Sequence, residues 1–115
     1  MVNISKNDVL ITFIQFVNGT DGKKRPVLVV VEDEQAVGVY AITTKYSDKS
    51  KFIKKQYYPI KDWRQAGLKV KSYVDIGSKY TFKKRELSYY KIGHLSIRDI
   101  RDLEEFIVQF TKNQN

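Results

Sequence analysis

The stretch PVLVVVE, residues 26–32, decides the fold of this chain. It is apolar on both strand faces, as expected of a strand that is buried on both sides or closed into a small barrel. Pro26 suits the first position of such a strand, because its missing N–H breaks no hydrogen bond there. Three cations precede it, Lys23, Lys24 and Arg25. Composition alone leaves open whether they form a solvated turn or a functional site.

The composition predicts one basic, globular domain spanning residues 1–115. Hydrophobic residues make up 42% of the chain, enough for a real core. Lysine and arginine number 21 against 13 acids, and the net charge of +8 attracts polyanions such as nucleic acid or an acidic protein. The lack of cysteine excludes disulfides and thiolate chemistry. We expect a cytoplasmic protein with no membrane span or membrane partner.

The hydrophobic pattern predicts strands first and one helix last. Period-2 and continuous apolar runs indicate five strands, at residues 8–17, 26–32, 37–44, 52–60 and 72–83. Gly77 is expected to kink or bulge the last of these strands. Apolar residues at helical spacing then predict an amphipathic helix over residues 97–111. This order indicates an α+β fold, a small and strongly bent antiparallel sheet or barrel packed on a C-terminal α-helix.

Several chemistries are excluded by the residues present. His94 is the one histidine, so neither a two-His zinc site nor a two-His ribonuclease mechanism can be built within one chain. His94 itself is most simply a surface or capping residue, and Trp63 a core residue. Tyrosines interleaved with cations can stack exposed bases but also suit half-buried strands: Tyr57, Tyr58, Tyr89 and Tyr90.

Phosphodiester cleavage without a metal cage remains possible. Cutting RNA through its own 2′-hydroxyl requires a proton acceptor, a group that neutralises the phosphate and a proton donor for the leaving oxygen. Arginine suits the phosphate, because its planar fork donates two parallel hydrogen bonds. Arg25 could meet Thr43 or Thr44 if their strands are antiparallel neighbours. The spacing alone leaves this open.

At this point the sequence resembles the MazF/PemK family of toxin–antitoxin ribonucleases. The similar segments run in order along nearly the whole chain: NDVLITFIQF, GTDGKKRPVLVV, VYAITT, SYVDIGSKYTFKKREL and IGHLSIRDIRDLEEFI. The Arg-Pro pair followed by a valine-rich strand is the most distinctive of them.

The resemblance implies an SH3-like barrel with a terminal helix, usually a homodimer, that cleaves single-stranded RNA without metal or cofactor. The expected products are a cyclic phosphate and a 5′-hydroxyl end, and the expected protein partner is an acidic antitoxin. By the same resemblance Arg25 is the catalytic arginine and Thr43 the hydroxyl after the third strand, with Thr44 as the register-shifted alternative. Four lysines are expected to hold the flanking RNA backbone: Lys24, Lys45, Lys54 and Lys55.

The sequence also departs from the family pattern. Asn7 stands where glycine is common, a change that a turn tolerates because asparagine also adopts positive φ. Gly77 stands where some members carry an acid, and Asp75 is on the same strand face if no bulge intervenes. Asp75 is therefore either a proton acceptor or a structural ion pair. Two other functions remain open, a non-catalytic SH3-like nucleic-acid-binding module and a scaffold that binds an acidic protein.

Overall fold

The computed structural model describes residues 4–14 and 23–113. Six strands carry the fold: β1 (Asp8–Ile14), β2 (Lys23–Glu32), β3 (Ala36–Thr43), β4 (Tyr57–Pro59), β5 (Tyr73–Lys83) and β6 (Tyr89–His94). The helices are the single turn α1 (Lys51–Lys54), the 3₁₀ turn η1 (Lys84–Glu86) and the long α2 (Ile97–Asn113). The predicted C-terminal helix is confirmed and extends to Asn113.

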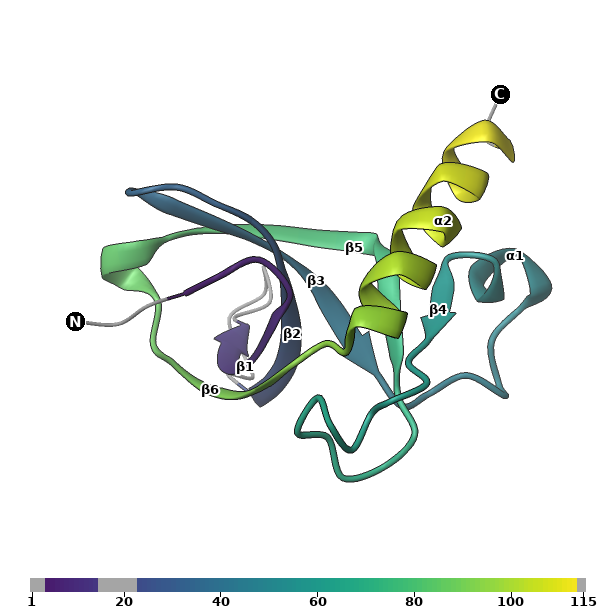
Figure 1. The fold of residues 1–115 in the computed structure, drawn as a ribbon, viewed down its shortest axis with the longest axis horizontal. Coiled ribbons are helices and arrows are strands. Elements are labelled where there is room, and N and C mark those ends of the chain that lie inside the picture. Colours follow the sequence, from purple (N-terminus) through teal and green to yellow (C-terminus); the bar gives the residue numbers. More distant parts are fainter. Residues whose placement is uncertain (1–3, 15–22, 114–115) are drawn as a thin grey trace.

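The strands form one antiparallel sheet in the order β4-β5-β3-β2-β1-β6. The sheet is strongly bent, and α2 lies at its β4 end next to α1 (Figure 1). In the described ranges the edge strands β4 and β6 are not hydrogen-bonded to each other, so the barrel is not closed. The α+β class with a bent antiparallel sheet and a C-terminal helix is thus confirmed.

Both faces of the sheet are buried, which explains the apolar run of β2. One face, here the helix face, packs against α2. Its core includes Val9, Leu28, Ile42 and Val74 of the sheet together with Leu103 of α2. The other, here the inner face, is formed by the bend of the sheet over itself and includes Leu10, Val27, Val29, Val37 and Val39. Successive residues of β2 alternate between the two clusters, so PVLVVVE serves both.

A buried carboxylate joins α2 to β4. Asp99 in the first turn of α2 is fully buried, and its Oδ1 accepts hydrogen bonds from the Tyr58 hydroxyl at 2.6 Å and from the Lys61 N–H at 2.9 Å. Its Oδ2 accepts from the Asp62 N–H at 2.8 Å, and the backbone N–H of Asp99 donates to Ser96 Oγ at 3.1 Å. Ser96 therefore caps the start of the helix, and Asp99 ties that start to a neighbouring turn.

That turn, residues 61–68, crosses β6 at close range. Gly67 has φ +84°, and a Cβ on Gly93 would overlap the Ala66 carbonyl, so both positions need glycine. Trp63 packs against the helix-face core, as predicted. Asn7 has φ +74°, which agrees with the positive φ proposed for it.

Two elements differ from the sequence prediction. Residues 51–54 form the helix α1, begun by Ser50 whose side chain accepts from the Ile53 N–H, so only Tyr57–Pro59 of the predicted 52–60 strand is extended. The strand β6 was not predicted. Residues 15–17 of the first predicted strand lie outside the described residues. Among the helices that the structure describes, none is long and apolar enough to cross a membrane.

Candidate nucleic-acid interface

One row of residues across the sheet joins the predicted site residues. Thr12 on β1 is paired with Arg25 on β2, and Thr43 on β3 is paired with Tyr73 on β5. Strands β2 and β3 are antiparallel neighbours with Val27 opposite Ala41. Continuing that register by two residues brings Arg25 opposite Thr43. The four residues therefore follow one another on the same face of adjacent strands.

Arg25 and Thr43 are accessible at the edge of the inner face. Arg25 is exposed and Thr43 is half-buried, whereas Val27, two residues further along β2 on the same face, is buried. The Thr43 hydroxyl oxygen accepts a hydrogen bond from the Lys45 N–H at 3.1 Å, which orients it and leaves its hydrogen for donation. The antiparallel pairing of β2 and β3, on which a meeting of Arg25 and Thr43 depends, is thus present.

Lys24 lies on the opposite face of β2 from Arg25, because neighbouring strand residues alternate. Its ammonium nitrogen lies 5.7 Å from the centre of the Tyr90 ring. Tyr90 is 53% exposed. The structure therefore separates this lysine from the arginine that follows it.

Asp75 lies beside the row, at a bulge. The β3–β5 register shifts between Tyr40 and Ala41, so that Tyr40 is opposite Lys79 but Ala41 is opposite Asp75. This three-residue shift reverses the face of the strand, and Val74 and Tyr80 accordingly pack into different cores. The condition set for Asp75, that no bulge intervenes, is therefore not met, because the register shift spans the bulge expected at Gly77.

The Asp75 carboxylate accepts hydrogen bonds from three groups around that bulge. They are the Gln56 side-chain amide at 2.9 Å, the Gly77 N–H at 3.0 Å and the Ser78 hydroxyl at 2.8 Å. The residue is 8% exposed. These bonds pin Gln56 and the bulged strand to one another.

A group of three tyrosines continues the row beyond Thr43. Tyr46 and Tyr73 stack with ring centroids 4.5 Å apart and an interplanar angle of 9°. Tyr57 is tilted against both, at 6.2 Å from Tyr46 and 6.3 Å from Tyr73. Burial, followed by the charges of Asp75 and Asp48, raises the pKa of the Tyr57 hydroxyl. We name these three residues the tyrosine cluster.

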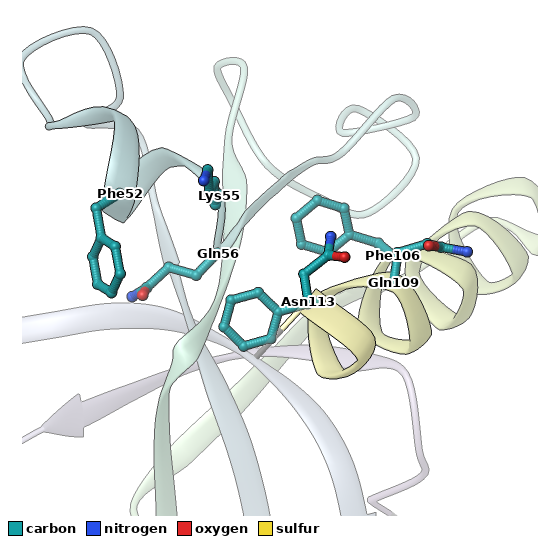
Figure 2. A pocket seen from close by; sticks show the side chains of 7 residues that line it. Phe52, Lys55, Gln56, Phe106, Gln109 and Asn113 are labelled. Atoms are coloured by element: carbon teal, nitrogen blue, oxygen red, sulfur yellow. The ribbon is translucent and has the colours of Figure 1, made fainter. Parts of the chain in front are cut away.

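The remaining predicted lysines are divided between two surfaces. Lys54 joins the tyrosine cluster, with its ammonium 4.9 Å from the Tyr46 ring centre. Lys45 and Thr44 are exposed just past the end of β3. Lys55 instead lines a cavity of about 410 Å³ together with Phe52, Gln56, Phe106, Gln109, Phe110 and Asn113. Figure 2 shows Phe52, Lys55 and Gln56 on one side of this groove and Phe106, Gln109 and Asn113 of α2 on the other.

His94 has a structural contact rather than a place in the row. Its Nδ1 lies 2.8 Å from Oδ1 of the fully buried Asp8, which also contacts the Lys91 ammonium at 3.1 Å. Burial alone would raise the pKa of Asp8, but the bonds from His94, Ser5 and Lys91 lower it overall. Within the described ranges, no three His, Asp or Glu side chains gather to hold a metal ion.

Two members of the tyrosine cluster were not predicted as site residues. Tyr46 and Tyr73 are 27 residues apart in the sequence, and only the β3–β5 pairing brings them together. Of the four tyrosines singled out from the sequence, Tyr57 joins the cluster, whereas Tyr58 is buried in the helix-face core.

The fold and the row define a small basic α+β protein with cations and aromatic rings gathered at one end of its sheet. The chain is matched over residues 7–111 by the family model of the PemK-like, MazF-like toxin of type II toxin-antitoxin systems. Because the match spans nearly the whole sequence, the chain belongs to this toxin family. No individual curated protein matches it.

Proposed function

We propose that this toxin is a metal-independent endoribonuclease that cleaves single-stranded RNA through the 2′-hydroxyl. Family membership supports the general activity. The single observation that supports the site is the antiparallel β2–β3 pairing, whose register, continued by two residues, brings Arg25 opposite Thr43 at an accessible end of the sheet. The backbones of two neighbouring strands lie about one strand spacing apart, ~5 Å, so the guanidinium and the hydroxyl can reach oxygens of the same phosphate group.

In the proposed reaction the 2′-oxygen attacks phosphorus and the bond from phosphorus to the 5′-oxygen breaks. The products are a 2′,3′-cyclic phosphate and a 5′-hydroxyl end; the 2′-oxygen gives its proton to water, and the 5′-oxygen takes one from the Arg25 guanidinium, which regains it from water. Arg25 would hold the phosphate oxygens and donate a hydrogen bond toward the leaving oxygen, and Thr43 would donate to a second phosphate oxygen. Charge accumulates on these oxygens in the transition state, so both contacts strengthen there.

For Asp75 we propose a positioning role. Its three hydrogen bonds fix the bulge of β5 and the Gln56 side chain, and Tyr73 opposite Thr43 lies two residues before it on the same strand. Flanking RNA would run over Lys45 and Lys54, which lie on the Thr43 side of the sheet, whereas Lys24 would reach only backbone that passes to the other face.

The test is cleavage of single-stranded RNA by the purified toxin in the presence of EDTA. We expect cutting to persist in EDTA and the products to end in a cyclic phosphate and a 5′-hydroxyl, identified by end-labelling that requires a free 5′-hydroxyl. Retention of RNA without any cutting would contradict the proposal and favour the non-catalytic binding module.

We further propose that an acidic antitoxin segment binds the groove between α1 and α2. The groove is lined by three phenylalanines, and Lys55 stands at its wall. Phe52 is 72% exposed. Aromatic anchors beside a cation suit an acidic amphipathic peptide. Phe52→Ser should weaken binding of the antitoxin but leave RNA cleavage intact. Unchanged antitoxin binding, or association of two toxin copies through this groove, would contradict this proposed antitoxin site.

The predicted homodimer also belongs to this proposal. Sedimentation equilibrium of the purified toxin should give twice the mass of the 115-residue chain. A mass equal to one chain at micromolar concentration would contradict it.

A further inference from the structure

The tyrosine cluster is the strongest unassigned feature next to the phosphate site. Tyr46 and Tyr73 are stacked in parallel at 4.5 Å, and both are partly exposed. Tyr57 is only 7% exposed and is tilted against them, so it forms the base of the group. Tyr73 lies on β5 and Tyr46 in the connection between β3 and α1, and their parallel rings are already arranged as the aromatic platforms on which nucleobases stack.

Cations lie over this stack at both ends. The Lys54 ammonium is 4.9 Å from the Tyr46 ring centre, and the Lys71 ammonium is 5.8 Å from the Tyr73 ring centre. Lys71 is exposed, so its flexible head group can leave the ring for a phosphate at little cost. The ring face that it leaves is then open to a base, while the lysine neutralises the adjoining backbone.

The cluster lies at a fixed distance from the proposed reaction centre. Tyr73 is opposite Thr43, and Arg25 is one strand further in the same row. Two strand spacings separate Arg25 from Tyr73, about 10 Å. A phosphate held at Arg25 therefore leaves a neighbouring nucleotide of the same strand within reach of the Tyr73 ring.

We propose that Tyr73, supported by Tyr46, is a stacking site for an unpaired base of RNA next to the phosphate bound by Arg25. This inference rests on the proposed function for the identity of the ligand. The site requires an unpaired base, because a base inside a duplex offers no face to the ring. It gives the toxin a physical reason to prefer single-stranded over double-stranded RNA.

The cluster also joins Tyr46, in the connection between β3 and α1, to Tyr57 of β4 and Tyr73 of β5, and a purely structural role would predict different behaviour. If the role is structural, a substitution in the cluster should weaken the binding of every ligand equally. A stacking site, in contrast, discriminates between RNA with bases and RNA without them. Tyr90 provides a matched control, because it is an exposed tyrosine with a lysine over its ring but lies on the opposite face of the sheet.

The experiment measures binding of short 2′-O-methylated RNA, which cannot be cut because its 2′-oxygen is blocked. Two probes are compared, one of mixed sequence and one of the same length with abasic sugars. The proteins are the wild type, Tyr73→Leu, Tyr73→Phe and Tyr90→Leu, each checked for folding by its urea midpoint. Tyr46→Leu, which retains the strand residue, is a second test in case Tyr73→Leu does not fold.

Tyr73→Leu should bind the mixed-sequence RNA about tenfold more weakly than the wild type. Its affinity for the abasic RNA should be unchanged. Tyr73→Phe and Tyr90→Leu should behave as the wild type. Equal losses on both probes by a folded variant, or no loss on either, would overturn the stacking site. The proposed function is tested by a separate measurement, cleavage of unmodified RNA by the wild type, so its failure can be told apart from failure of the stacking site.

Discussion

Removing the Tyr58 hydroxyl tests the link between β4 and α2 that fixes one side of the fold. The side chain is 3% exposed and its hydroxyl donates to the fully buried Asp99 carboxylate at 2.6 Å. Burial, strengthened by this hydrogen bond, raises the pKa of the Tyr58 hydroxyl, so it remains a donor over the whole working range of pH. In Tyr58→Phe the carboxylate keeps its bonds from Lys61 and Asp62 and loses this one.

The expected loss follows from the type of bond. A hydrogen bond to a charged group contributes about 1.5–3 kcal/mol, and the phenylalanine ring fills the same space, so no cavity is added. We expect the free energy of unfolding to fall by about 2 kcal/mol, which corresponds to about 6–10 °C in Tm for a chain of this size. Urea unfolding with linear extrapolation measures it.

The control is Tyr90→Phe, since Tyr90 is 53% exposed. It should change stability by less than about 0.5 kcal/mol. In an Asp99→Asn background the Tyr58 hydroxyl donates to a neutral amide oxygen instead of a carboxylate. Tyr58→Phe should then lower the free energy of unfolding by only about 1 kcal/mol. A loss as small in Tyr58→Phe as in Tyr90→Phe would refute the account of this contact.

Two further predictions concern the other carboxylates. Asp75→Asn keeps one oxygen, which can still accept from two of the three donors around Asp75. Its rate of cleavage should therefore remain within about tenfold of the wild-type rate, whereas Asp75→Ala should lose more of its activity. Complete loss of cleavage in both variants would instead identify the carboxylate as the proton acceptor. The lowered pKa of Asp8 predicts a contribution to stability that is full above its ordinary value of 3.8 and is lost as pH falls through the lower folded value. Urea midpoints between neutral pH and about pH 2 should therefore fall less steeply in Asp8→Asn than in the wild type, and parallel curves would contradict the role of the Asp8–His94 contact.

The parts of the fold that sequence predicts are those with a strong local pattern. The valines of β2 and β3 form continuous apolar runs because both faces of these strands are buried, and α2 repeats its apolar residues at helical spacing. Strand β6 lacks such a signal, since most of its residues are exposed or half-buried. Helix α1 was mistaken for a strand because its four residues are too few for a helical period, although Ser50 marks its start.

The candidate site likewise has residues that the sequence predicts and residues that it does not. Arg25 and Thr43 were predicted from the family resemblance of the segments at two strand ends, and the β2–β3 register, continued by two residues, brings them opposite one another. The tyrosine cluster could not be predicted, because Tyr46 and Tyr73 meet only through pairing between distant segments. The environment of Asp75 depends on a bulge whose length no local pattern specifies, and a shift by an odd number of residues reverses the face of the strand.

The most direct test of the central claim compares Arg25→Ala with Lys24→Ala in cleavage of single-stranded RNA. The two cations are adjacent in the sequence and both exposed, but they lie on opposite faces of β2. Arg25→Ala should reduce the rate of cutting at least about 100-fold, the usual effect of losing a donor to a charged transition state. Lys24→Ala should reduce it less than about tenfold, as expected of a cation outside the reaction centre. Equal rates for Arg25→Ala and the wild type, or equal losses in the two variants, would contradict the account.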